Sequence, residues 1–393
     1  MYTLPDSIKL LLNDGSDLGI AYPLESKRFR LFFSTINESL RSKEATSIDD
    51  IVEQLEENVL FGPTSDALEV LRAQRLLVFA LLGWQSMLFL PSFEDSTYGQ
   101  LAIRKAPDVP NSGLLFDTYS VSENLADRPL AILLKAYGNL LPVCCRSSRT
   151  VVSELARTVQ SWTSLSPFDT NAYLLHTLLR VEIRWVDTLA LHLDYDKSSR
   201  TLSLFRYPSF CIAMLQSKGA LYAFASTESD AVDPRATEEE ITFFLQEILL
   251  SYRLLFGQSR PARRFFRNML SRGSVLSQNP DSLLRSLCLD QHFADTLVPA
   301  DRLVYVTLRD FLVLGKWVEL LAAELRCTRP RSWRDLLRDQ RDSLQYWTFW
   351  LVAIFGVTSI VLSLMQVILS LVQVMQAQQS SITASPRRVN LRR

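Results

Sequence analysis

The sequence predicts a mainly α-helical protein with a small antiparallel β-sheet, an α+β body, followed by one C-terminal transmembrane helix. Three observations lead to this expectation. No acidic or basic residue occurs between Asp342 and Arg387, and most of that stretch is apolar. Apolar residues recur at helical spacing in several segments of the body. They alternate at the period of a strand over residues 181–207.

The uncharged stretch predicts a membrane-spanning helix over residues 347–371. About 20 apolar residues cross a hydrocarbon layer of roughly 30 Å, so the run crosses once and is too short to cross twice. A buried core helix is the alternative. Aromatic residues at its start suit the headgroup level of a bilayer. The predicted anchor residues are Trp347, Trp350, Leu351, Ile354, Phe355, Ile360 and Leu364.

The flanking segments predict how the anchor is oriented. Arginines precede the span at Arg326, Arg329, Arg331, Arg334, Arg338 and Arg341, and this basic excess favours a cytosolic body. The early run of Leu10, Leu11 and Leu12 is too short for a signal peptide. We therefore expect post-translational, tail-anchored insertion into the endoplasmic reticulum or the outer mitochondrial membrane.

Residues 331–346 are predicted to form a helical stalk between the body, residues 1–330, and the span. Its helix would begin at a capping box over residues 332–335. A short basic tail, residues 372–393, follows the span. Gln366 and Gln373 lie on one helical face and could contact a neighbouring helix in a homo-oligomer. Alternatively, both side chains could be hydrated at the membrane–water interface where the span ends.

Within the body, a helix is predicted over residues 65–90. Its apolar part, residues 76–90, is interpreted as a core helix, with membrane association as the alternative. Residues 91–142 contain Pro107, Pro110 and Pro129 and are expected to form loops and short elements. A β-hairpin region is predicted over residues 181–207, with its turn at residues 197–199. The helical pattern returns at Glu238.

A basic amphipathic helix is predicted after Ser259. Phe265 and Phe266 lie on one face of this helix, and Arg263, Arg264 and Arg267 lie on the other. Such a helix could contact an anionic membrane surface. An ordinary surface helix with its phenylalanines in the core is the favoured alternative.

Composition argues against several kinds of partner. The chain has 393 residues, with 42 basic and 42 acidic side chains, so no overall positive field attracts nucleic acid. Its 5 cysteines include no CxxC motif, and no histidine stands at metal-ligand spacing. We therefore expect no metal, no cofactor and a reducing compartment.

One weak catalytic motif occurs. His192 and Asp196 have the HxxxD spacing of some acyltransferases, in which the histidine acts as the general base. A histidine on the polar side of a hairpin strand is the favoured alternative. Phosphate-binding glycine motifs and the GxSxG and HExxH motifs are absent from the sequence.

Several sequence segments resemble those of a known family. They are GWQSMLF (83–89), HLDYD (192–196), LFRYPSFC (204–211), ILLSYRLLFGQ (248–258) and RDQRDSLQYWTFWLV (338–352). Together they resemble an uncharacterised family of filamentous-fungal proteins with a C-terminal membrane anchor. The resemblance implies a cytosolic body and an association with secondary-metabolite pathways, and it carries no activity.

The C-terminal layout is also faintly similar to CorA-type magnesium channels. Their Gly-Met-Asn motif and second span are missing from this sequence. The favoured hypothesis is therefore a non-catalytic, single-pass accessory or scaffold protein that contacts membrane lipid and an unidentified protein. An anchored acyltransferase-like enzyme and a channel-like oligomer are the alternatives.

Overall fold

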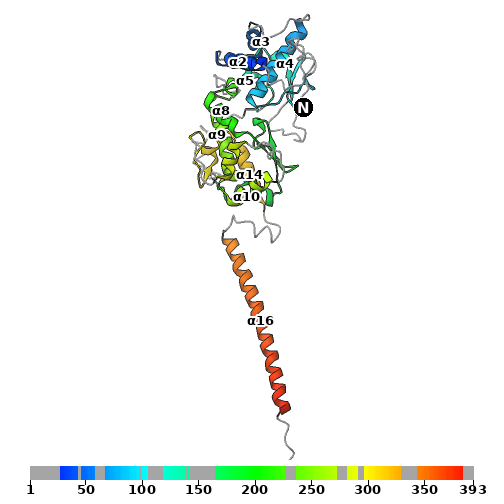
Figure 1. The fold of residues 1–393 in the computed structure, drawn as a ribbon, viewed down its shortest axis with the longest axis vertical. Coiled ribbons are helices and arrows are strands. Elements are labelled where there is room, and N and C mark those ends of the chain that lie inside the picture. The colour runs from blue at the N-terminus through cyan, green and yellow to red at the C-terminus, as the bar shows by residue number, and fades with distance from the viewer. Residues whose placement is uncertain are drawn as a thin grey trace, which may run out of the picture. The chain divides into compact units, whose positions relative to one another are not determined.

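The computed structural model of the chain describes residues 27–42, 46–57, 67–96, 99–104, 118–138, 140–141, 164–225, 236–271, 281–290, 296–328 and 343–383. The chain divides into two compact units, Met1–Arg329 and Pro330–Arg393, which we call the body and the C-terminal unit (Figure 1). Each unit is considered separately below.

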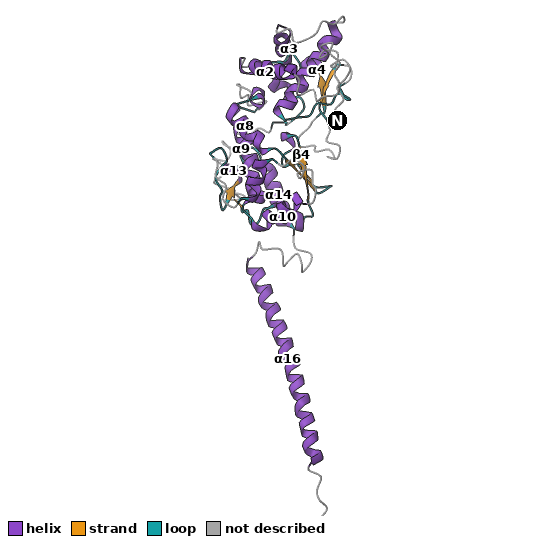
Figure 2. Cartoon of the chain, in the orientation of Figure 1, coloured by secondary structure: helices purple, strands orange, loops and turns teal. Residues whose placement is uncertain are grey.

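Helices dominate the described part of the body, and its strands are short (Figure 2). In chain order its elements are α2 (Lys27–Ser42), α3 (Ile48–Glu57), α4 (Ala67–Ser86), β1 (Gln100–Ala102), β2 (Ser120–Ser122), η2 (Glu123–Leu125), α5 (Leu130–Lys135), β3 (Ser164–Leu165), α7 (Ala172–Leu178), β4 (Glu182–Val186), η3 (Leu189–Leu191), β5 (Tyr195–Asp196), β6 (Thr201–Phe205), α8 (Pro208–Ser217), η4 (Ala220–Phe224), α9 (Glu238–Tyr252), η5 (Arg253–Gly257), α10 (Arg260–Ser271), α12 (Ser282–Leu289), β7 (Tyr305–Val306), α13 (Thr307–Asp310) and α14 (Gly315–Cys327). The predicted fold class, mainly α with small antiparallel sheets, is confirmed.

One large hydrophobic cluster runs through the body, from Phe32 on α2 to Leu325 on α14. Helix α3 packs against α2 and α4, and α8 packs against α9. Residues 91–142, which were expected to hold loops and short elements, contribute β1, β2, η2 and α5 among their described parts. They pack into this core within the same compact unit.

The three-stranded sheet has the order β4-β6-β5. The predicted hairpin is confirmed for β5 and β6, which pair antiparallel around the turn at residues 197–200. Strand β4 pairs with β6 in parallel, with Glu182 opposite Thr201. All of β6 is buried, as is typical of a central strand that is covered on both faces.

Residues 189–193 are not the strand that their alternating leucines predicted. Leu189–Leu191 form a short 3₁₀ helix, and Leu193 takes a positive φ of 64°. Residues 188–195 are all buried, the polar ones included, so the segment crosses the core and has no solvated face. Alternation signals a strand only where one face of the chain meets water.

Helix α4 confirms the predicted core helix and ends earlier than expected. Leu77 to Leu82 are at most 1 % exposed, so the apolar segment lies in the body's own core. The helix stops at Ser86, because Met87 turns the chain with a φ of 51°.

Helix α9 begins at Glu238, as predicted. Thr237 caps it through a reciprocal pair of hydrogen bonds with Glu240. The helix then widens into a π-helical turn, η5, which ends at Gly257. A Cβ at Gly257 would lie 2.5 Å from the carbonyl oxygen of Leu287, so this close approach to α12 requires glycine.

The C-terminal unit contains one described helix, α16 (Ser343–Thr383), of 41 residues. The helix begins four residues before the predicted span of residues 347–371 and continues 12 residues beyond it. Of the predicted stalk, residues 331–342 lie outside the described residues, and 343–346 belong to α16.

Candidate membrane anchor

Helix α16 is long and apolar enough to cross a membrane. Its segment Trp347–Gln379 has 33 residues and a mean hydropathy of 2.3. At about 1.5 Å per residue this segment is about 50 Å long, against roughly 30 Å of hydrocarbon. No other helix among the described residues meets the same criteria.

The anchor side chains are exposed, which separates α16 from a soluble core helix. None of its most apolar window is buried. The exposed fractions of the predicted anchor residues are 69 % for Trp347, 39 % for Trp350, 54 % for Leu351, 60 % for Ile354, 67 % for Phe355, 63 % for Ile360 and 56 % for Leu364. So much contiguous apolar surface is rare in contact with water and normal in contact with lipid.

Two hydroxyl groups on α16 are satisfied within the helix itself. Thr358 Oγ1 donates to the carbonyl of Ile354 at 2.7 Å, and Ser370 Oγ donates to the carbonyl of Gln366 at 2.8 Å. These bonds leave no free hydroxyl hydrogen at either position. They are suited to an apolar medium, because no water is needed to complete them.

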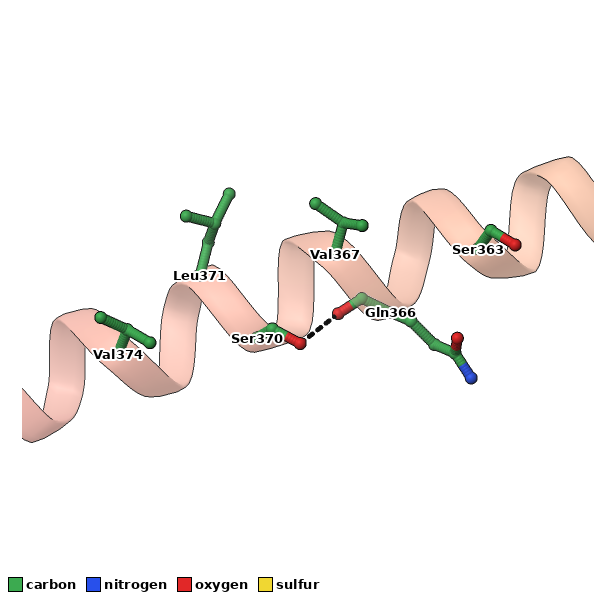
Figure 3. A pocket seen from close by; sticks show the side chains of 6 residues that line it. All are labelled: Ser363, Gln366, Val367, Ser370, Leu371 and Val374. Atoms are coloured by element: carbon green, nitrogen blue, oxygen red, sulfur yellow. Dashed lines mark hydrogen bonds between the residues drawn. The ribbon is translucent and has the colours of Figure 1, made fainter.

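A shallow groove runs along one face of α16. It is lined by Ser363, Gln366, Val367, Ser370, Leu371 and Val374 (Figure 3). In Figure 3 the carboxamide of Gln366 extends away from the helix, and the hydroxyl of Ser370 bonds to the backbone carbonyl of Gln366.

The HxxxD residues do not form a catalytic pair. His192 is 1 % exposed, and both of its ring nitrogens are engaged: Nε2 lies 2.8 Å from Ser251 Oγ, and Nδ1 accepts from the backbone N–H of Phe205 at 3.2 Å. Because Ser251 Oγ donates to the carbonyl of Ile248, Nε2 must carry the proton. Burial lowers the pKa of His192 to about 3.

Asp196 binds its own turn instead. Its carboxylate accepts from the backbone N–H and hydroxyl of Ser198 and from the N–H of Ser199. The histidine is therefore a buried core residue whose hydrogen-bonding groups are satisfied. The expectation that it lies on the polar side of a strand is wrong. The aspartate shapes the β5–β6 hairpin, and neither residue is placed for acyl transfer.

The amphipathic helix α10 turns its apolar face into the body. Phe266 is fully buried, with its ring 5.2 Å from that of Phe256, and Phe265 stacks on His176 at 4.8 Å. Phe266 is therefore not available to lipid, whereas Phe265 is half-buried and packs against the core with part of its ring exposed. The favoured alternative, a surface helix with its phenylalanines in the core, is confirmed.

The arginines of α10 face outward or bind locally. Arg264 and Arg267 are exposed, and Arg263 donates to the carbonyl of Gly257 at 2.7 Å. Burial, followed by repulsion from Arg253, Arg260 and Arg267, lowers the pKa of Arg263. Arg264 and Arg267 therefore contribute to a basic surface on α10.

Arg253 and Glu247 are buried charged residues that were not anticipated from the sequence. Arg253 is fully buried and pairs with Asp301, with Nε to Oδ1 at 2.9 Å. Glu247 accepts from the backbone N–H of Val313 and Leu314, just before α14, and burial raises its pKa to about 7. Their sequence positions could have indicated this burial, because each is a charged residue at an apolar position of a helical pattern. A charge at such a position is expected to be paired or hydrogen-bonded in the interior.

The described residues offer no metal site, since no cluster of three or more His, Cys, Asp or Glu side chains occurs among them. Cys211 and Cys288 are buried free thiols, and burial raises the pKa of both. Cys327 is an exposed free thiol. Comparisons with protein-family models, curated proteins and solved structures found no match to the chain.

Proposed function

We propose that this protein is a single-pass membrane protein whose body serves as a non-catalytic accessory or scaffold module. The observation that carries this proposal is α16, whose 33-residue apolar segment has no buried residue in its most apolar window. A helix of this kind lowers its free energy by entering lipid, since about 25 cal/mol is gained for each Å² of apolar surface removed from water.

The scaffold role is supported by the chemistry of the body. The one motif that suggested catalysis, His192 with Asp196, is used for packing and for a turn. The basic surface of α10 and the exposed apolar side chains of Leu303, Val304 and Leu308 are available for a protein partner. The partner and the pathway, including the secondary-metabolite association that the resemblance implies, stay predictions.

A cytosolic body is supported by two features. Arginines precede the span from Arg326 to Arg341, and such residues are retained on the cytosolic side. Cys211, Cys288 and Cys327 are free thiols, as is usual in a reducing compartment.

Carbonate extraction of the full-length protein tests the anchor. The intact protein should stay with the membrane pellet at alkaline pH, whereas a variant lacking residues 343–383 should appear in the supernatant. Release of the intact protein by carbonate would refute the proposal. The matched control is Val361→Leu, which preserves the apolar character of α16 and should stay in the pellet.

Protease protection tests the orientation. In sealed microsomes, a protease added from outside should digest the body and leave a short C-terminal fragment that contains α16. Full protection of the body until detergent is added would place it on the luminal side and overturn the proposed orientation.

A further inference from the structure

Five of the six polar residues between Gly356 and Gln373 of α16 share one face. Between residues 351 and 377, small and polar side chains follow one another at spacings of three and four. This is the 3.5-residue repeat of a helix-pairing face. We call this face the polar seam, and its members are Gly356, Ser359, Ser363, Gln366, Ser370, Gln373 and Ala377.

The remaining residues of the span support this assignment. Thr358 is a polar residue of the span outside the polar seam, and its hydroxyl is already bonded to Ile354. A Cβ added at Gly356 would meet nothing within 4 Å, so the seam is open at this position. The groove of Figure 3 is lined by three seam residues, Ser363, Gln366 and Ser370, and by three apolar residues that flank the seam.

The carboxamide of Gln366 needs a partner if α16 is in lipid. With Trp350 at the headgroup level, about 20 residues of hydrocarbon place Gln366 inside the layer and Gln373 at its far boundary. A carboxamide carries two donor hydrogens and an acceptor oxygen. Leaving such groups unpaired in hydrocarbon costs several kcal/mol.

We propose that two copies of the chain associate in the membrane by packing their α16 helices in parallel along the polar seam. A two-fold axis parallel to the helices brings each seam residue opposite the same residue at the same depth. Because a carboxamide both donates and accepts, Gln366 can pair with its counterpart in the second copy. Glycine and serine let the two backbones approach closely, and the seam's repeat fits a left-handed crossing.

This inference rests on the proposed insertion of α16 into a membrane. In water the same helix would associate through the opposite, apolar face, which includes Val357, Val361, Leu364 and Ile368. The medium therefore decides which face is in contact, and this difference can be tested.

Disulfide cross-linking of the full-length protein in native membranes is the test. Ser363→Cys places a thiol on the polar seam, and Val361→Cys places one on the opposite face of the same helical turn. Oxidation should give a covalent dimer for Ser363→Cys, and only the level of the unsubstituted protein, with its native cysteines, for Val361→Cys. Equal cross-linking at both positions, or stronger cross-linking at position 361, would overturn the proposal.

Glutamine variants test the chemistry of the contact. Gln366→Leu should reduce the dimer fraction in mild detergent roughly three- to tenfold, and Gln373→Leu should have a smaller effect because it lies at the boundary. A dimer fraction that Gln366→Leu leaves unchanged would refute the seam contact. Carbonate extraction distinguishes failure of the dimer proposal from failure of the anchor proposal. A monomer that resists carbonate refutes only the dimer, whereas release by carbonate refutes the membrane anchor.

Discussion

Helices α4 and α16 are both rich in leucine, valine and phenylalanine, but they have opposite surroundings. In α4, Leu77 to Leu82 are at most 1 % exposed and pack in the body's core. In α16, Ile354 and Phe355 are 60 % and 67 % exposed. Apolar composition alone therefore does not decide whether a helix ends up in protein or in lipid.

Length and charge distinguish the two helices. Helix α4 has 20 residues, and its Arg75 forms ion pairs with Asp49 and Glu123 at 2.7 and 3.0 Å. These pairs attach the start of α4 to α3 and η2. Helix α16 has no charged residue along its 41 residues. Helix α16 therefore has no ion pair of the kind that attaches α4 to its neighbours.

The largest expected effect is a cavity in α4. The Phe79 side chain is fully buried and stacks on Phe89 at 4.7 Å and on Tyr137 at 6.0 Å. Phe79→Ala should lower the free energy of unfolding of the body by about 3–5 kcal/mol. This free energy is measured by unfolding the detergent-solubilised protein in urea and following near-ultraviolet circular dichroism. Carbonate resistance should not change, and its loss would show that α4 also contributes to membrane attachment.

A charge introduced into α16 should weaken membrane attachment and leave the stability of the body unchanged, the opposite of the effect of Phe79→Ala. Val361 lies near the middle of the span, on the face opposite the polar seam. Val361→Arg should make membrane insertion less favourable by about 2.5–3.5 kcal/mol. The fraction recovered in the carbonate pellet should fall, while the unfolding midpoint of the body stays unchanged. A fall in that midpoint would show that α16 packs against the body.

The third effect is a pH dependence that belongs to the body alone. The folded-state pKa of His192, about 3, lies below its ordinary value of 6.5. His192 therefore contributes stability that is complete above pH 6.5 and is lost as the pH falls from 6.5 toward 3. The loss between pH 6.5 and 5 should be about 2 kcal/mol.

The control for this pH dependence is a pair of histidine variants. His192→Asn should remove the contribution of His192, so that on lowering the pH from 6.5 to 5 the variant loses about 2 kcal/mol less unfolding free energy than the wild type. His176→Asn should keep the pH dependence of the wild type. Glu247, whose raised pKa gives a slope of opposite sign over this range, is present in every variant, so the difference between wild type and variant reports on His192. Equal pH dependences in the wild type and His192→Asn would contradict the buried, neutral state of His192.

The smallest effect compares one glycine from each helix. A Cβ at Gly83 in α4 would lie 2.7 Å from Cε2 of Phe89, whose ring is buried, whereas at Gly356 in α16 it would meet nothing within 4 Å. Gly83→Ala should destabilise the body by about 1–3 kcal/mol. Gly356→Ala should not change that stability. Equal effects in urea unfolding would contradict the difference in packing.

The sequence predicted those parts of the molecule that depend on local patterns. The start of α9 and the turn between β5 and β6 follow from capping and turn residues close by in the chain. Helix α16 continues to Thr383, beyond the predicted span of residues 347–371, because glutamine and serine do not stop a helix.

Features that depend on tertiary partners could not be predicted in this way. Alternation identified β4 as a strand but gave no sign that its neighbour is β6 in parallel. His192 was expected on a polar face, and its burial depends on Ser251, which lies 59 residues further along the chain. Arg253 and Glu247 are interior residues only because distant loops supply their hydrogen-bond partners.

The excess length of Trp347–Gln379 has a consequence for membranes of different thickness. Placing all 33 residues in a roughly 30 Å layer would require a tilt beyond the 0–40° found for spanning helices, so the glutamine-rich end must emerge. The first charge after the span is Arg387, so the helix can shift along the bilayer normal by several residues without drawing a charge into the hydrocarbon. The anchor should therefore tolerate both thin and thick bilayers.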